Sequence, residues 1–278
     1  MFAKRKLFIA TKHQKETVIT PLLEKQLGVF CFTMEDFETD NLGTFCGEKL
    51  REQDPLSTLR AKCDQGRIHS RRDLVIANEG SFGGHPSFPF AQADDEIVML
   101  KDYKNNLEIV ARELSLSTNL NASKIEDEQQ LLAFAKKIQF PAHAIILKYT
   151  KDNARIIYKG IQNKILLTQK FRQLKAKYGY AFAKTDMRAR YNPTRMAVIE
   201  KAVLNLIKKI KNNCPQCHTP GFDVVKVDSG LPCENCCTPT RSVLSCTYEC
   251  KECAYTEKEF YPKQKRTEDP NFCDNCNP

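Results

Sequence analysis

The hydrophobic and polar positions of the first 147 residues form the pattern of an α/β fold. Short apolar runs recur between longer segments of mixed polarity, and each run is too short to be a helix. Runs of this length that are bounded by turn residues are typical of buried strands. They predict a mixed sheet whose strands lie at residues 6–10, 29–32, 74–77, 96–101 and 107–114.

Two helices are predicted between these strands from their terminal residues. Thr20-Pro21 and Asp54-Pro55 each place a capping side chain before a proline, which suits the first position of a helix. We expect the two helices to end at Gly28 and Gly66, because glycine readily adopts the left-handed conformation found at helix C-termini. The segment 78–84 contains three glycines and is predicted to be a loop.

The chain after residue 120 continues with the same kinds of element and then changes in composition. The pattern predicts an α/β domain at residues 1–211, in which helices flank the mixed sheet, and a cysteine-rich region at 212–278. In the second half of that domain we expect helices near 125–138 and 164–178, strands at 144–149 and 155–159, and an amphipathic helix at 194–211.

Eight of the thirteen cysteines form four Cys-x-x-Cys pairs after residue 211. Two intervening residues let a tight turn direct both thiolates at one ion, and Zn²⁺ takes four such ligands. The sequence therefore predicts two structural zinc sites in a zinc-ribbon-like region. The spacing leaves open whether each site uses sequential or cross-braced pairs. The predicted ligands are Cys214, Cys217, Cys233, Cys236, Cys250, Cys253, Cys273 and Cys276.

The alternative for these cysteines is a disulfide framework, which requires an oxidising compartment. The apolar run at 7–10 is too short for a secretory signal, and no run reaches the roughly 20 residues of a membrane span. We therefore expect a cytoplasmic protein with no membrane partner. Cys31, Cys46 and Cys63 lack ligand spacing and are predicted to be core thiols rather than nucleophiles.

The net charge of +9 is concentrated in one stretch of the chain. Residues 148–211 carry 17 Lys and Arg against 3 Asp and Glu, whereas residues 214–278 carry 7 against 10. The cysteine-rich region would repel phosphates, so we expect it to dock a partner or to stabilise the protein. The basic stretch could bind RNA if aromatic side chains lie beside the charges. The candidates for stacking are Tyr149, Tyr158, Phe171, Tyr178, Tyr180 and Tyr191.

Two basic segments supply candidate phosphate ligands. Lys12, His13 and Lys15 lie in a polar turn between a predicted strand and a helix, where free N–H groups favour anions. Arg188 and Arg195 lie just before the last predicted helix or at its start, and a guanidinium can bind phosphate oxygens bidentately. These residues predict a nucleotide or another phosphorylated small molecule as ligand.

Acidic residues near glycines supply candidate ligands for Mg²⁺. Glu48 and Glu79 lie in glycine-containing segments, where a carboxylate can approach a metal closely. Asp95, Glu96 and Asp102 are further candidates in or next to predicted strands. If these acids hold Mg²⁺ next to the basic residues, the two groups together would form a site for a triphosphate.

Several segments resemble an uncharacterised bacterial family, a domain of unknown function, over nearly the whole chain. The resemblance implies no activity. It rests on ATKHQKE, GTFCGE, NEGSFG, TDMRARYNPTRM and the terminal cysteine pattern.

A more distant resemblance is to the inosine triphosphate pyrophosphatase and Maf-like superfamily, including its xanthosine triphosphatase branch. It rests on the turn at 10–15, the segment 44–48, the helix around Lys62, the Asn78-Glu79-Gly80 segment and Arg195. The acidic pair of the superfamily is reduced here to Glu79, and the serine and histidine before the late arginine are missing.

This second resemblance implies Mg²⁺-dependent hydrolysis of a nucleoside triphosphate or a related phosphoanhydride. Glu48 and Glu79 would be the catalytic acids, which hold the metal or orient water. Lys12, Lys15 and Arg195, with Arg188, would hold the phosphates. The alternative is a non-enzymatic RNA-binding or partner-docking zinc-ribbon protein.

Overall fold

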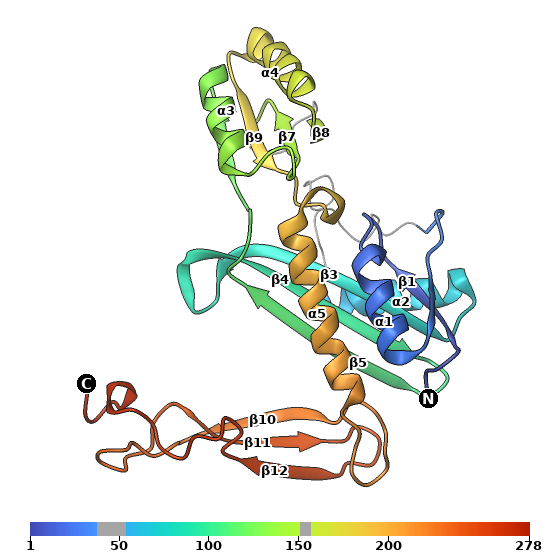
Figure 1. The fold of residues 1–278 in the computed structure, drawn as a ribbon, viewed down its shortest axis with the longest axis vertical. Coiled ribbons are helices and arrows are strands. Elements are labelled where there is room, and N and C mark those ends of the chain that lie inside the picture. The colour runs from blue at the N-terminus through green and yellow to red at the C-terminus, as the bar shows by residue number, and fades with distance from the viewer. Residues whose placement is uncertain (38–53, 151–156) are drawn as a thin grey trace. The chain divides into compact units, whose positions relative to one another are not determined.

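The computed structural model describes residues 1–37, 54–150 and 157–278 and has a mixed α/β fold with several sheets (Figure 1). The α/β class predicted from the sequence is therefore confirmed. The chain divides into two compact units, Met1–Leu206 and Ile207–Pro278. Within the described ranges, none of the helices combines the length and apolar character that crossing a bilayer requires.

The largest sheet of the first unit has five strands in the order β2-β1-β3-β4-β5. Strand β1 is parallel to both of its neighbours, and β3, β4 and β5 form an antiparallel meander. The sheet is thus parallel around β1 and antiparallel beyond β3. Its strands are β1 (Lys6–Ala10), β2 (Phe30–Phe32), β3 (Leu74–His85), β4 (Phe88–Asp102) and β5 (Leu107–Ser115).

Helices cover both faces of this sheet. Helices α1 (Glu16–Leu27) and α5 (Pro193–Lys211) lie on one face, and α2 (Pro55–Ser70) lies on the other (Figure 1). The side chain of Asp54 caps α2 as predicted, since it accepts from the backbone N–H groups of Leu56 and Ser57. The core beneath α2 includes Phe8, Leu59, Cys63, Val75 and Met99.

Two predicted helix ends were wrong. Helix α1 begins at Glu16, so Pro21 lies inside it, and α2 continues past Gly66 to Ser70. An added Cβ at Gly66 would lie 3.1 Å from Ala10 Cβ and from the ring of Phe8. Gly66 therefore serves close packing of the helix on the sheet, and it does not end the helix. Gly28 does end α1, with a φ of 66°.

The predicted loop at 78–84 was also wrong, because this segment is the second half of β3. Asn78 pairs with Val98, Gly80 with Glu96 and Phe82 with Asp94, all in the long hairpin that β3 forms with β4. Pairing with β4 supplies hydrogen-bond partners for the backbone N–H and C=O groups of this segment, and this outweighs the low strand preference of glycine. Glu79 is consequently in the middle of a strand and not at its end.

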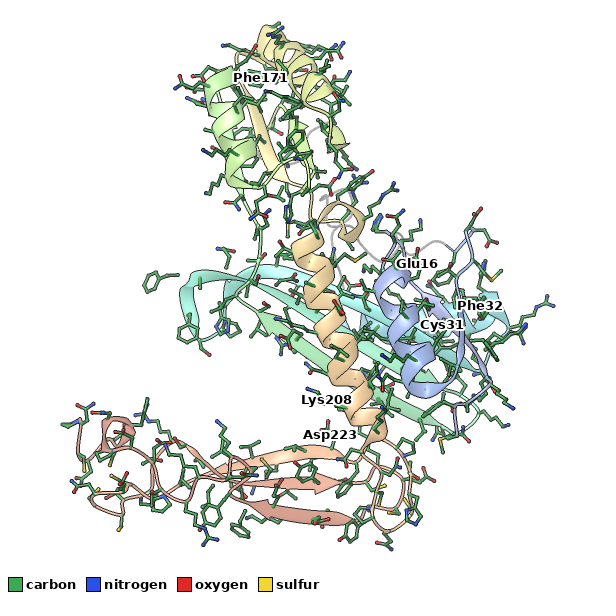
Figure 2. The ribbon with its side chains drawn as sticks, viewed as in Figure 1. Glu16, Cys31, Phe32, Phe171, Lys208 and Asp223 are labelled. Atoms are coloured by element: carbon green, nitrogen blue, oxygen red, sulfur yellow. The ribbon has the colours of Figure 1, made fainter. Side chains whose placement is uncertain are left out.

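The first unit also contains a four-stranded sheet in the order β6-β9-β7-β8. Phe171 of α4 is fully buried in the core between this sheet and its helices (Figure 2). The sequence pattern did not predict β6 or β9, both of which are short and of mixed polarity. The elements are β6 (Ala122–Ile125), α3 (Glu128–Lys137), β7 (Ile145–Lys148), β8 (Ile157–Ile161), α4 (Lys164–Tyr178) and β9 (Ala181–Thr185), followed by the 3-10 turn η2 (Ala189–Tyr191).

The second unit is built on a three-stranded antiparallel sheet in the order β10-β11-β12. Its strands are connected by the cysteine-containing turns, so the sheet and the thiol clusters form one structure. The elements are β10 (Asp223–Ser229), β11 (Val243–Glu249), β12 (Thr256–Phe260) and the 3-10 turn η3 (Pro270–Phe272).

Candidate functional site

The eight paired cysteines of the second unit form two clusters of four. In each cluster the four sulfur atoms lie within 4.8 Å of one another. Four of the Sγ···Sγ distances are 3.5–3.9 Å. A tetrahedral ion with metal–sulfur bonds of about 2.3 Å would separate its sulfurs by about 3.8 Å. Both clusters therefore have the size of a four-thiolate metal site, as expected from the sequence.

The two clusters are cross-braced. The first consists of Cys214, Cys217, Cys250 and Cys253, and the second of Cys233, Cys236, Cys273 and Cys276. Antiparallel pairing explains this arrangement, because the start of β10 lies beside the end of β11, with Asp223 opposite Glu249. The first and third pairs are therefore brought together at one end of the hairpin, and the second pair is left for the fourth.

All four pairs adopt the same tight turn. In each turn, the backbone N–H of the residue after the second cysteine donates to the carbonyl of the first cysteine at 2.9–3.0 Å. This repeated turn brings two thiols to one side of the backbone, which is the arrangement that a shared ion requires. The four donor–acceptor pairs are His218–Cys214, Cys237–Cys233, Ala254–Cys250 and Asn277–Cys273.

A threonine lies beside the second cysteine of the first two pairs. Cys217 Sγ is 3.3 Å from Thr219 Oγ1, and Cys236 Sγ is 3.3 Å from Thr238 Oγ1. The threonine hydroxyls lower the pKa of Cys217 to about 6 and that of Cys236 to about 5. The thiolate is the form that binds a metal, so these threonines favour metal binding.

In the first unit, three of the candidate phosphate residues follow the carboxyl end of β1. This strand has β2 on one side and β3 on the other, and the chain reaches β2 through α1 and β3 through α2. Such a switch point at the carboxyl end of parallel strands is where ligands bind in open α/β sheets. The turn after β1 contains Lys12 and His13, and Lys15 directly precedes α1.

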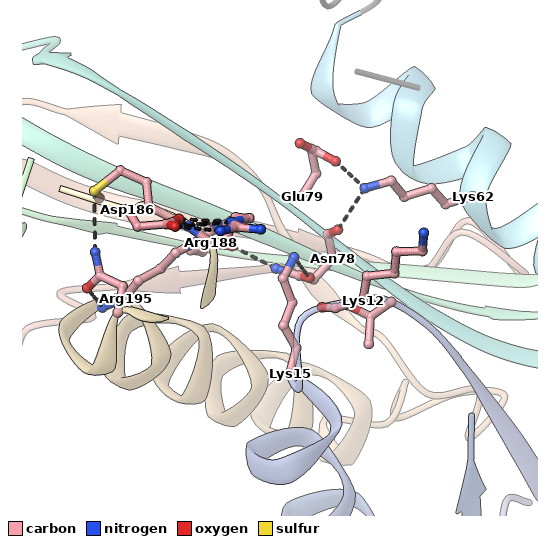
Figure 3. Close-up of polar contacts among 12 residues, drawn as sticks. Lys12, Lys15, Lys62, Asn78, Glu79, Asp186, Arg188 and Arg195 are labelled. Carbon is pink, nitrogen blue, oxygen red and sulfur yellow. Dashed lines mark hydrogen bonds and ion pairs between the residues drawn. The ribbon is translucent and has the colours of Figure 1, made fainter. Parts of the chain in front are cut away.

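Two lysines from different elements meet at Asn78 (Figure 3). Lys15 Nζ donates to Asn78 Oδ1 at 2.6 Å. Lys62 Nζ, from α2, lies 3.3 Å from the Asn78 carbonyl oxygen and forms an ion pair with Glu79. The Asn78 side chain then donates through Nδ2 to Glu96 Oε2 at 2.7 Å. One asparagine thus connects charged groups on both faces of the sheet.

The connection continues from Glu96 to α5. Arg195 Nε donates to Glu96 Oε1 at 2.6 Å, and Arg195 Nη1 donates to the Met187 carbonyl at 2.6 Å. Both side chains of this ion pair are fully buried. The pair sits directly over Gly80, where an added Cβ would lie 2.6 Å from Arg195 Nη2. Gly80 is therefore required for the close approach of these charges to the sheet.

Asp94 is a member of this cluster that sequence reasoning missed. It is 1% exposed, and neither of its carboxylate oxygens has a hydrogen-bond partner among the described residues. It lies two residues before Glu96 on the same face of β4, because side chains alternate along a strand. Asp94, Asp95 and Glu96 form a run of three acids directly before the apolar stretch 97–100, and this run is a sequence signal that could have identified it.

Burial shifts the pKa values of two of these side chains toward neutral pH. The pKa of Lys15 is lowered to about 7, mainly because burial disfavours the ammonium ion and then because Arg195 is near. The pKa of Asp94 is raised to about 8, mainly by burial and then by the charge of Glu96. Pairs of buried groups shifted in this way are characteristic of functional sites.

Other predicted site residues lie apart from this cluster or outside it. Glu48 falls outside the described residues. Arg188 is held by Asp186, with Nη2 2.6 Å from Oδ2, and its guanidinium lies over Tyr191. Two acids that were considered as Mg²⁺ ligands form other ion pairs, Asp95 with Arg112 and Asp102 with Arg5.

The candidate aromatic residues of the basic stretch have varied environments. Phe171 belongs to the core, and Tyr149 stacks on Tyr178 with ring centroids 4.7 Å apart. Tyr158 and Tyr180 each lie under a lysine, Lys170 and Lys124 respectively. Of the scattered thiols, Cys63 is in the core as predicted, Cys31 is half-buried, and Cys46 lies outside the described residues. Burial raises the pKa of both Cys31 and Cys63 to about 12.

The chain belongs to the family described as a domain of unknown function, DUF6671, whose model matches residues 62–278. The matched range includes Lys62, Glu79, Arg195 and all eight paired cysteines, whereas the turn with Lys12 and Lys15 precedes it. No curated protein shows a significant match to the sequence.

Proposed function

We propose that the first unit of this DUF6671 member hydrolyses a phosphoanhydride bond of a nucleoside triphosphate or a related compound, with a divalent metal ion. The observation that supports this proposal is one network in which Lys15, Glu96 and Arg195 lie on one face of the sheet and Lys62 and Glu79 on the other. These residues come from the start of α1, from α2, β3 and β4, and from α5, and hydrogen bonds connect them through Asn78.

A purely structural role explains such a cluster poorly. Removing charges from water is costly, and a buried ion pair often contributes no more stability than apolar side chains of the same size. The fully buried pair of Arg195 and Glu96 and the buried Lys15 therefore favour a functional role.

The arrangement has the parts that a polyphosphate site needs. Lys15 and Arg195 supply positive charge, Lys12 lies in the turn before α1, and the positive end of the α1 dipole favours an anion. Charge that develops on phosphoryl oxygens during hydrolysis would be stabilised by these fixed cations. The resemblance to the pyrophosphatase superfamily points to the same residues.

The oxygen ligands of the cluster fit Mg²⁺, which prefers carboxylates and water. Glu96 is the carboxylate on the face of Lys15 and Arg195 that would hold it, whereas Glu79 points to the opposite face, beside Lys62. When bound, the ion would neutralise phosphate charge and lower the pKa of water. Glu79 forms an ion pair with Lys62. Its carboxylate would orient the attacking water and accept a proton from it.

We also propose that both cysteine clusters hold structural zinc. Four thiolates at tetrahedral spacing are the common ligand set of structural Zn²⁺. The ions would fix both ends of the three-stranded sheet, which has little apolar core of its own: Phe222 and Tyr248 pack beside the first cluster.

The test is a screen of canonical and modified nucleoside triphosphates with the full-length, zinc-loaded protein and Mg²⁺ or Mn²⁺. We expect release of pyrophosphate or phosphate from one class of nucleotide, and none without the added metal. No release from any nucleotide would contradict the proposal. RNA binding that grows with oligomer length, and that triphosphate does not inhibit, would favour the RNA-binding alternative.

A further inference from the structure

The face of β4 that carries Asp94 and Glu96 has an unusual polar character. Across the sheet, Asp94 lies opposite Phe82 on one side and Ser115 on the other, and Glu96 lies opposite Gly80. Phe82 and Gly80 offer no side-chain donor to either acid. The two carboxylates are thus neighbours on a buried surface on which the sheet itself supplies them with no cation.

The two acids differ in how they are satisfied. Glu96 accepts from Arg195 at one oxygen and from Asn78 at the other. Asp94 is equally buried, yet both of its oxygens lack a hydrogen-bond partner within the described ranges. A carboxylate has about four acceptor positions, and a buried one without a hydrogen-bond donor is strongly disfavoured.

We propose that Asp94, together with Glu96, binds a hard divalent cation such as Mg²⁺ or Mn²⁺. Each Glu96 oxygen keeps a second lone pair after bonding Arg195 or Asn78, so it can share an ion with Asp94. Two carboxylates completed by water or phosphate oxygens are a common ligand set for Mg²⁺. The site itself follows from the geometry; only the role of the ion in hydrolysis rests on the proposed function.

This assignment also gives the cluster a suitable charge. With Asp94 and Glu96 neutralised by the ion, the charge of Arg195 is left for an anionic ligand, and that ligand favours the charged form of Lys15. The metal and the polyphosphate would then bind together, since each reduces the charge that opposes the other. The substrate class is therefore a metal-complexed polyphosphate and not a free monophosphate.

Mn²⁺ binding by full-length, zinc-loaded protein, measured by electron paramagnetic resonance without nucleotide, tests the site. The variant is Asp94→Asn, which keeps the shape and removes the charge. Asp95→Asn is the matched control, because Asp95 is the next residue of the same strand but pairs with Arg112. Zinc should stay in the thiolate clusters, since thiolates prefer it to Mn²⁺.

We expect one Mn²⁺ site in the wild-type protein and in Asp95→Asn, with Mg²⁺ as competitor. Asp94→Asn should bind Mn²⁺ at least about tenfold more weakly, as even outer ligands of metal sites contribute that much. Equal Mn²⁺ binding by Asp94→Asn, or no binding by the wild type at millimolar Mn²⁺, would overturn the proposal. Mn²⁺ binding without hydrolysis of any nucleotide would refute the proposed function alone. Hydrolysis by Asp94→Asn at the wild-type rate would refute only the role of this metal site in the reaction.

Discussion

Arg195 Nε lies 2.6 Å from Glu96 Oε1, although the two residues are 99 positions apart in the chain. This buried ion pair joins the first turn of α5 to the middle of β4. It also lies against Gly80 of the neighbouring strand and over the ring of Phe82, 5.1 Å from the ring centroid. The start of α5 is thereby fixed on the sheet at the point where the charged cluster is built.

Substitution of Gly80 should disturb this ion pair directly. The added methyl group of Gly80→Ala would overlap Arg195 and Glu96, and we expect a loss of about 1–3 kcal/mol in the free energy of unfolding. Gly83→Ala, on the same strand, is the control, because its Cβ would meet open space. Chemical denaturation measures both. Equal stability of the two variants would show that the close approach at Gly80 is unimportant.

Glu79→Gln should abolish most of the proposed hydrolysis. The change keeps the shape of the side chain and removes the charge, so we expect turnover to fall by at least about 100-fold, on the order of 3 kcal/mol in the activation barrier. Glu108→Gln removes a carboxylate that pairs with an arginine, Arg60, at an exposed position, and should leave turnover unchanged. Initial rates of phosphate release check this, with circular dichroism to verify folding. Undiminished turnover in Glu79→Gln would exclude its catalytic role.

Binding of a polyphosphate should add a proton to Lys15 in mildly alkaline solution. The pKa of Lys15 in the folded protein is about 7, so this lysine is mostly neutral at pH 8, and a bound anion favours its charged form. We expect an uptake that approaches one proton at pH 8 and disappears at pH 6, where Lys15 is already charged. Titration calorimetry in buffers of different ionisation enthalpy measures the uptake.

The control for this measurement is Lys12→Met, which removes a lysine from the same turn and should retain the uptake. Lys15→Met should lose it. The low pKa also has a consequence for stability: the unfolded chain holds this proton up to about pH 10.5, so the cost of burying Lys15 is full below pH 7 and declines as pH rises from 7 to 10.5. An identical uptake by Lys15→Met would assign the proton to another group.

Metal content should reveal which cysteines share an ion. Cys214→Ser combined with Cys250→Ser should remove one zinc per chain, because both belong to the first cluster. Cys214→Ser combined with Cys233→Ser should remove two. Sequential pairing would give the opposite result, so native mass spectrometry distinguishes the alternatives directly. Cys246→Ser, at a half-buried position outside both clusters, is the control and should keep both ions.

Local signals in the sequence were sufficient for several elements of the fold. Helix α4 begins and ends at the predicted residues, 164 and 178. Asn163 caps its first turn, and Gly179 ends it in the left-handed conformation. Asp54 caps α2 in the same way. These features depend on a few neighbouring residues, and residue preferences describe such short-range effects well.

Long-range contacts explain what the sequence pattern did not give. Gly66 and Gly80 look like breaks in a helix and in a strand, yet each exists for a partner that is distant in sequence. The site shows both kinds of signal. The turn with Lys15 was identified locally, from its position between a predicted strand and a predicted helix. The neighbourhood of Asp94, Glu96 and Arg195 depends on where α5 lies, which no local signal specifies.

The cross-braced clusters set an order of assembly during synthesis. The first site has all of its ligands once the chain reaches Cys253, but the second lacks half of its ligands until Cys276 has been made. A growing chain that has reached Cys253 therefore contains three complete cysteine pairs, but it can assemble only the first cluster. The hairpin of β10 and β11 selects between them, because its pairing brings Cys214 beside Cys253 and carries Cys233 to the opposite end. The strand register thus keeps Cys233 and Cys236 away from the first cluster, so that they remain available to Cys273 and Cys276.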